Sequence, residues 1–216
     1  MRIVMKFGGN LMDGAERIDH SSNLVIDRVK KGDEVIVVVS AMSNVTDELI
    51  YMSEYARIGE IEKVRSKIEE LEKRLIDTAR KICSEEIINE IEQKIKSIIN
   101  LLDQCLTGVF LLRELTPRSK DLIQSFGERL SAPIMRGALI SKGVKAIDLT
   151  GGEAGIITDS NYGNARPLMN LTEIMVREKL LPIIKAGIVP VITGFIAQDS
   201  NGVITTLGRG GSDYTA

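Results

Sequence analysis

Two short runs of β-branched residues constrain the fold of this chain more than any other feature. Residues 34–39 read Glu-Val-Ile-Val-Val-Val, and residues 188–193 read Ile-Val-Pro-Val-Ile-Thr. Neither run alternates apolar with polar residues, which is typical of strands that are buried on both faces. Each follows a segment of helical periodicity that stops at a glycine, Gly32 or Gly187. The pattern predicts an α/β fold, a three-layer α/β/α sandwich with a mainly parallel central sheet.

The middle of the chain, at about residues 48–115, has a different pattern. It contains no proline, and its apolar residues recur at helical spacing in two series, from Ile61 to Ile82 and from Ile87 to Leu102. Ser84 lies between the two series and is placed to cap the second. We expect an inserted long helical hairpin with a structural role, whose charged faces are solvated.

Composition and charge argue against several classes of protein. With 28 Lys and Arg against 30 Asp and Glu, the formal net charge is −2, so neither nucleic acid nor an anionic membrane is expected as a partner. We see no apolar run near the roughly 18 residues of a membrane span and no secretory signal, and we expect a cytoplasmic protein. Cys83 and Cys105 belong to no Cys/His cluster, so no metal site is predicted. His20 lies in a polar stretch and is not expected to be catalytic.

A glycine pair follows the first predicted strand, residues 2–7. Because ligands of a parallel sheet bind at the carboxyl ends of its strands, the segment Lys6-Phe7-Gly8-Gly9 lies where a ligand is expected. Adjacent glycines let backbone N–H groups approach an anion, and Lys6 adds a positive charge. The lysine precedes the glycines, so this is not a Walker A loop. A phosphate cradle and a purely structural turn both fit.

A second glycine-rich segment, residues 208–213, follows a predicted hairpin whose turn is Asn201-Gly202. It reads Gly-Arg-Gly-Gly-Ser-Asp and precedes a predicted helix, so its backbone N–H groups are available to an anion. The planar guanidinium of Arg209 suits a carboxylate or a phosphate. An anion site is the favoured interpretation, and a turn with a surface charge is the alternative.

Single polar residues give weaker signals. Ser40 and Thr46 flank the loop after the strand at 34–39, where capping would explain them. Glu128 lies in a predicted helix, where an acid is usually solvated. No acid–base pair and no nucleophile–base pair stands out. Phosphoryl transfer to a carboxylate needs neither, because an ionised carboxylate is already a nucleophile and catalysis rests on positioning and on neutralising phosphate charge.

Five segments of the chain resemble aspartokinases, a family with the amino-acid kinase fold. The resemblance covers nearly the whole chain and is weakest across the helical stretch. The segments are VMKFGG (4–9), VVVSAMSNVTD (37–47), SFGERLSAP (125–133), GGEAGIITD (151–159) and VITGFIAQDSNGVITTLGRGGSDYTA (191–216). The last is highly specific, whereas KFGG is shared by many kinases of that fold.

This resemblance implies a domain and a reaction. Residues 1–216 would be the amino-terminal part of an amino-acid kinase catalytic domain with a helical insertion at about 48–115, and the adenine-binding half and the ACT regulatory domains would be absent. The reaction would be ATP-dependent phosphorylation of the side-chain carboxylate of L-aspartate to 4-phospho-L-aspartate, at the start of lysine, methionine and threonine synthesis. ATP would enter with Mg²⁺ bound mainly by the nucleotide. The oligomeric state is open, and a homo-oligomer is compatible with the resemblance.

The resemblance also implies a role for each candidate residue. Lys6 would stabilise charge on the transferred phosphoryl group, and Asp213 would orient Lys6. Glu128 would pair with the α-ammonium group of aspartate, and Arg209 with its α-carboxylate. The remaining phosphate contacts would come from Phe7, Gly8, Gly9, Gly210 and Gly211, and the remaining aspartate contacts from Ser40, Thr46, Phe195 and Ser212.

One departure and two alternatives accompany this interpretation. The family commonly has Thr-Ser after KFGG, whereas this chain has Asn10-Leu11, and Leu11 cannot supply a hydroxyl. Another small-carboxylate kinase of the same fold is one alternative. The other is a truncated, catalytically weak module that binds aspartate, because without an adenine site we expect residues 1–216 alone to bind ATP poorly.

Overall fold

The central sheet brings several strand ends together at one edge. The computed structural model describes residues 1–208 and 210–216. The strands of the sheet pair in parallel in the order β1-β2-β5-β3. They are β1 (Arg2–Phe7), β2 (Glu34–Val39), β5 (Val189–Thr193) and β3 (Ala146–Leu149). Because Phe7 pairs with Val39 and Val39 with Thr193, the carboxyl ends of β1, β2 and β5 are neighbours. The predicted parallel sheet is confirmed.

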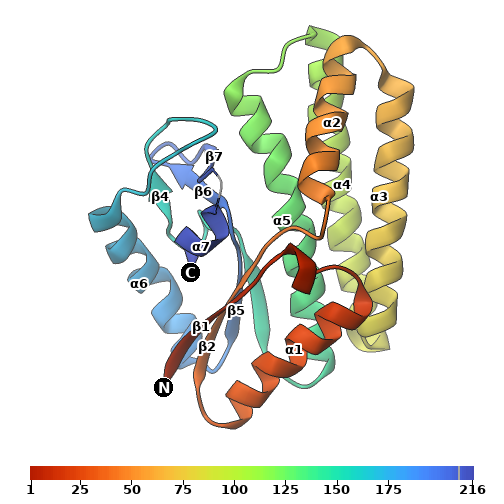
Figure 1. Ribbon diagram of the computed structural model, residues 1–216. Coiled ribbons are helices and arrows are strands. Elements are labelled where there is room, and N and C mark those ends of the chain that lie inside the picture. The colour runs from red at the N-terminus through yellow and green to blue at the C-terminus, as the bar shows by residue number, and fades with distance from the viewer. Residues whose placement is uncertain (209) are drawn as a thin grey trace.

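Helices cover both faces of this sheet (Figure 1). On one face α1 (Ala15–Lys30) and α5 (Pro117–Ser141) share a core with Val37 of β2. On the other face α6 (Met169–Lys185) packs against Val38. Alternate residues of β2 therefore face different helix layers, which explains why the run has no polar alternation. The predicted three-layer sandwich is confirmed.

A second, smaller sheet combines one strand that precedes β5 in the chain with two strands that follow it. Its strands are β4 (Ile157–Thr158), β6 (Ile196–Asp199) and β7 (Ile204–Thr206), in the order β4-β6-β7. Strands β6 and β7 form the predicted antiparallel hairpin. The Asp199 carboxylate holds the turn by accepting the N–H groups of Asn201 at 2.9 Å and Val203 at 3.0 Å. The short helix α7 (Gly211–Thr215) follows and contacts β2.

The middle of the chain forms three helices rather than a pair. The predicted hairpin is present as α3 (Ile61–Ile82) and α4 (Glu85–Leu112), but α2 (Val45–Ile58) is a separate helix before it. Helix α2 ends where Gly59 adopts a φ of 95°, a left-handed conformation that glycine tolerates best. Helices α2 to α5 pack together as a bundle beside the sheet (Figure 1).

The N-terminus of α4 differs in detail from the prediction. Ser84 is the N-cap residue, as expected, but its side chain makes no capping hydrogen bond. Its backbone N–H instead donates to the Ser141 hydroxyl at 2.8 Å. The turn of the hairpin is thereby attached to the end of α5.

Among the residues that the structure describes, one helix, α4, is long and apolar enough to cross a membrane by length and composition alone. An 18-residue window within it has a mean hydropathy of 1.4. The expectation that no segment approaches such a span is therefore wrong. A core helix of a bundle passes the same test, and Ile91, Ile95 and Leu102 of α4 are fully buried in the common core.

The two cysteines are unpaired and half-buried. Burial raises the pKa of the Cys83 thiol to about 11, and it also raises the pKa of Cys105. Because the thiolate is the reactive form, both side chains are chemically quiet near neutral pH.

Asp121 connects α5 to the smaller sheet. It is 1% exposed, and its carboxylate accepts the N–H groups of Gly163 at 2.9 Å and Thr206 at 3.0 Å and the hydroxyl of Thr206 at 2.9 Å. Burial raises the pKa of Asp121, and the three donors oppose that rise. This one side chain fixes the position of β7 relative to α5.

Asp121→Ala should therefore destabilise the fold. The substitution leaves the buried N–H of Thr206 without its acceptor, and an unsatisfied buried group costs about 1–3 kcal/mol. We expect the free energy of unfolding to fall by about 2–4 kcal/mol in urea titrations. Glu69→Ala, at an exposed position of α3, is the control and should change it by less than about 0.5 kcal/mol. Equal values for both variants would contradict the role of Asp121.

Candidate functional site

A cavity of about 620 Å³ opens where β1, β2 and β5 end. Its walls come from the end of β1, the loop and helix after β2, α5, the loop between β4 and α6, and the chain from β5 into α7. The lining residues are Lys6, Ser40, Thr46, Asp47, Ile50, Gln124, Glu128, Gly163, Phe195, Gly208, Gly210, Gly211, Ser212 and Asp213. Residues far apart in sequence thus converge at the sheet edge where ligands of parallel sheets bind.

Most of the residues predicted for the site line this cavity, with four exceptions. Phe7 is 3% exposed and belongs to the core between the sheet and α1. Gly8 and Gly9 form the turn after β1, where Gly8 accepts the N–H of Leu11 at 2.8 Å. Gly9 lines an adjoining cavity of about 650 Å³. Arg209 lies outside the described residues.

The ammonium group of Lys6 faces the cavity from the end of β1. Its Nζ lies 2.8 Å from Oδ1 of Asp213, which comes from α7. The Lys6 side chain is 31% exposed and that of Asp213 is 71% exposed, so the ion pair is accessible to solvent. A Cβ atom on Gly8 would lie 3.7 Å from the same Nζ, so the glycine leaves the ammonium group uncovered. Such a lysine is placed to donate to an anion that enters the cavity.

Serine side chains connect the three sides of the cavity. The Ser40 hydroxyl donates to Oγ of Ser212 at 3.0 Å, and the Ser131 hydroxyl of α5 donates to the Ser40 carbonyl at 2.8 Å. The absence of a side chain at Gly194 makes the first contact feasible, since a Cβ atom there would lie 2.5 Å from Oγ of Ser212. The loop after β2, α5 and α7 are therefore held in one arrangement.

Glu128 is the most unusual group of the site. It is 4% exposed, and its Oε2 atom has no hydrogen-bond partner among the described residues. Burial raises the pKa of its carboxyl group to about 8, although the N–H of Ala41 donates to it and opposes the rise. The neighbouring Gly127 allows α5 to pack this closely against the loop after β2. A residue with a side chain would not fit there, since its Cβ atom would lie only 2.8 Å from Cβ of Ala41. A buried carboxyl group with one unpartnered oxygen is placed to receive a cation.

Phe195 lines the cavity, and its backbone conformation is strained. Its φ of 64° is left-handed, which is uncommon for a residue with a side chain. Gly211 packs directly against it, since a Cβ atom on Gly211 would lie 3.1 Å from Cα of Phe195. Strain of this kind persists where the surrounding structure fixes the conformation, and it occurs often at functional sites.

Some lining residues were not predicted from the sequence. Asp47 lines both this cavity and the adjoining one, and Gln124 projects from α5 one turn before Glu128. The helical spacing of 124 and 128 is the signal that places Gln124 on the same face. Asn10, where the resemblance expects Thr, also lines the adjoining cavity, and its Oδ1 accepts the Ser43 hydroxyl at 3.3 Å.

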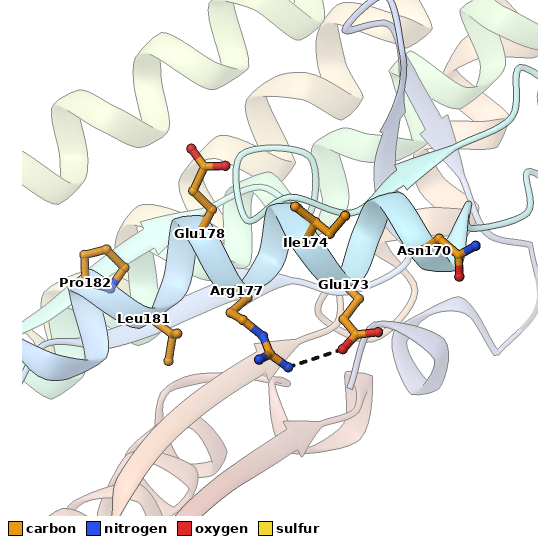
Figure 2. A pocket seen from close by; sticks show the side chains of 7 residues that line it. All are labelled: Asn170, Glu173, Ile174, Arg177, Glu178, Leu181 and Pro182. Atoms are coloured by element: carbon orange, nitrogen blue, oxygen red, sulfur yellow. Dashed lines mark hydrogen bonds and ion pairs between the residues drawn. The ribbon is translucent and has the colours of Figure 1, made fainter.

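A different depression runs along the outer surface of α6, as Figure 2 shows. Its volume is about 720 Å³, but every lining residue belongs to that single helix. The only interaction drawn there is the ion pair of Arg177 with Glu173 at 3.2 Å, and both side chains are well exposed. Because no second element converges on it, we do not regard this depression as the functional site.

Among residues 1–208 and 210–216, no group of three or more His, Cys, Asp or Glu side chains is placed to hold a metal ion.

Comparisons with known proteins place this chain in a family. The model of the amino acid kinase family matches residues 1–216. The aspartokinase of Geobacillus stearothermophilus is 34% identical over 99% of this chain and 38% of its own length. The chloroplastic aspartokinase 3 of Arabidopsis thaliana is 37% identical over 99% of this chain and 37% of its own length. The chain thus spans well under half the length of these relatives.

Solved structures support the same assignment. Aspartokinase III of E. coli in complex with aspartate and ADP superposes with a TM-score of 0.88 at 25% identity, over 100% of this chain and 45% of that one. The complex of the same enzyme with lysine and aspartate gives a TM-score of 0.86 over 99% of this chain and 45% of that one. With a parallel sheet and a converging cavity of the kind described above, and with a family model that matches its full length, this chain belongs to the amino acid kinase family.

Proposed function

We propose that this chain forms the substrate-binding part of an aspartate kinase, which transfers the γ-phosphoryl group of ATP to the side-chain carboxylate of L-aspartate. The observation that carries the proposal is Glu128, a buried carboxyl group with one unpartnered oxygen that lines the same cavity as the exposed Lys6. One group suits an ammonium ion and the other suits a phosphate. The similarity to aspartokinases supports the choice of aspartate.

Glu128 is proposed to bind the α-ammonium group of the substrate. An isolated buried carboxylate is unfavourable, and a bound ammonium group would offset the lost hydration by a charge-assisted hydrogen bond. Ser40, Thr46, Phe195 and Ser212 would contact the rest of the aspartate, and Arg209 would pair with its α-carboxylate. This arrangement would select an amino acid over a simple carboxylic acid.

Lys6 is proposed to act on the phosphoryl group. An oxygen of the substrate carboxylate attacks the γ-phosphorus, the bond from phosphorus to the β,γ-bridging oxygen breaks, and ADP leaves with the bonding electrons. Lys6 would neutralise charge on the transferred group, with Asp213 fixing its position through the 2.8 Å contact. Phe7, Gly8, Gly9, Gly210 and Gly211 would supply backbone contacts to phosphate, and Mg²⁺ would arrive with ATP.

The similarity to aspartokinases also supports proposals for the extent of the domain, the fate of the product and the oligomeric state. Residues 1–216 would be the amino-terminal part of a kinase catalytic domain, because the relatives that they match are much longer. The product, 4-phospho-L-aspartate, would enter lysine, threonine and methionine biosynthesis in the cytoplasm. A homo-oligomer is part of this proposal. Another small-carboxylate kinase is the second candidate, and the shared family favours it over a function outside phosphoryl transfer.

A substrate panel tests the reaction itself. ADP release with ATP, Mg²⁺ and L-aspartate, L-glutamate or succinate distinguishes the candidates, and ³¹P NMR detects the acyl phosphate. We expect slow turnover of L-aspartate by residues 1–216, which should bind ATP poorly without an adenine site, and at least tenfold less turnover of the other two substrates. Preference for L-glutamate would overturn the choice of substrate and would favour the second candidate.

Binding of L-aspartate should release a proton. With a pKa of about 8, the free Glu128 carboxyl group is mostly protonated at pH 7, and pairing with an ammonium group ionises it. We expect calorimetry in buffers of different ionisation enthalpy to show release of close to one proton at pH 7. Glu128→Gln should abolish the release and weaken binding at least tenfold, whereas Glu173→Gln on the surface of α6 should do neither. Proton release that persists in Glu128→Gln would contradict the assignment.

The same carboxyl group should make the stability of the ligand-free protein depend on pH. Its folded-state pKa of about 8 is above the unfolded value of 4.5, so between these values the folded state holds more protons than the unfolded state. Stability should therefore fall as pH rises from about 4.5 to about 8 and should then level off, by up to the order of 4 kcal/mol. Glu128→Gln should lack this component and be the more stable variant at pH 8.5 in urea titrations. Parallel profiles for the two proteins would contradict the burial argument.

Lys6→Met should separate chemistry from substrate binding. The substitution removes a charge that acts on the phosphoryl group, and loss of one such stabilising group costs about 10²–10³ in kcat. We expect a loss of that size with a Kd for L-aspartate that changes less than about threefold. A large loss of L-aspartate affinity with unchanged kcat would place Lys6 at the amino acid instead.

A further inference from the structure

A second polar cavity, of about 230 Å³, lies between α4, α5 and the carboxyl end of β3. Its lining includes Lys94, Arg129, Thr150, Glu153 and Thr193, none of which lines the candidate substrate cavity. Helix α5 stands between the two cavities. Successive residues of a helix project about 100° apart, so neighbouring positions of α5 can serve different cavities.

Arg129 is the distinctive group in this second cavity. Its guanidinium group stacks on the ring of Phe126, with 4.5 Å from Cζ to the ring centroid. It makes no hydrogen bond or ion pair with any residue that the structure describes. Partial burial lowers the pKa of its guanidinium group, and the neighbouring Cys105 and Glu153 oppose that shift. Stacking fixes the plane of the guanidinium group and leaves its N–H edge available for a planar anion.

The acidic side chains near Arg129 are engaged elsewhere. The Glu153 carboxylate accepts the N–H of Thr150 at 2.7 Å and the hydroxyl of Thr150 at 2.9 Å. Asp148 lies 2.9 Å from Nε of Arg136, in an ion-pair contact without aligned hydrogen-bond geometry. Neither carboxylate forms an ion pair or hydrogen bond with Arg129 among the described residues, although the charge of Glu153 is close enough to stabilise the guanidinium group through space.

A second cation and two hydroxyl groups complete the lining. Nζ of Lys94 lies 4.0 Å from Asp148, at the limit of an ion pair, and the lysine side chain is 53% exposed. The Thr193 hydroxyl accepts the N–H of Gly151 at 2.9 Å, so its own hydrogen is available to a ligand. Ser97 adds another hydroxyl from α4. All these groups can donate to an oxygen atom.

We propose that this cavity is a binding site for a small oxyanion, a carboxylate or a phosphate, held by the guanidinium group of Arg129 and the ammonium group of Lys94. A water molecule occupies about 30 Å³ of liquid. The cavity volume of about 230 Å³ therefore limits the ligand to a small molecule. The site is distinct from the phosphate contacts proposed around Lys6, and it does not depend on the proposed kinase reaction.

Titration with inorganic phosphate and with acetate, followed by ¹⁵N-NMR of the whole chain, tests the proposal. We expect saturable shifts at the amides of Thr150, Glu153 and Thr193. Arg129→Gln should weaken this binding at least tenfold, and Lys94→Gln, at a largely exposed side chain, should weaken it severalfold without affecting the fold. Arg177→Gln on α6 is the matched control and should leave the affinity unchanged.

The outcomes separate this site from the substrate cavity. Lys6→Met should leave the shifts at Thr150 and Thr193 intact, even if it removes shifts around Gly8. The proposal is overturned if neither probe causes saturable shifts at this cavity, or if Lys94→Gln and a folded Arg129→Gln bind as tightly as the unmodified chain. A phosphate response without an acetate response would identify the ligand class as phosphate, and the reverse would identify a carboxylate.

Discussion

The burial of the Glu128 carboxyl group is the constraint on which the rest of the candidate site depends. A carboxyl group with a partnerless oxygen stays buried only where its surroundings cannot open to water. Close contact of Gly127 with Ala41 supplies part of that rigidity. The rest comes from the bundle of α2 to α5, which shares one continuous hydrophobic core with the sheet. The helical insertion therefore supports the helix that carries the acid of the site.

Two ionisable groups of the cavity, Lys6 and Glu128, differ in their state before a ligand binds. Lys6 is already paired with Asp213 in a solvated contact, and exposed ion pairs contribute little to stability. Its three N–H donors allow it to keep this contact while it donates to an oxyanion. Glu128 has no such partner and is held largely protonated by burial. Binding at the lysine thus adds a contact, whereas binding at the glutamate changes a protonation state.

Much of the fold was predictable because segments that are buried on both faces have a recognisable apolar sequence pattern. The β-branched run at 34–39 matches β2 residue for residue, since both of its faces are covered. The separate helix α2 was missed, because its end depends on the conformation of Gly59 rather than on a proline. The burial of Glu128 was also unpredictable from its neighbours. It depends on contacts with Ala41, which is 87 residues away in sequence, and local patterns carry no information about such contacts.

One turn of α5 serves several purposes, because consecutive residues of a helix face different directions. Glu128 lines the candidate substrate cavity, Arg129 lines the second cavity, and the Ser131 hydroxyl holds the Ser40 carbonyl. A helix is suited to this, since its backbone hydrogen bonds are internal and its side chains can be assigned independently to each neighbour. The positions of these residues also depend on one another, because they lie on the same turn. Because Arg129 and Glu128 are adjacent in α5, a rotation of this helix that moved one of them would also move the other.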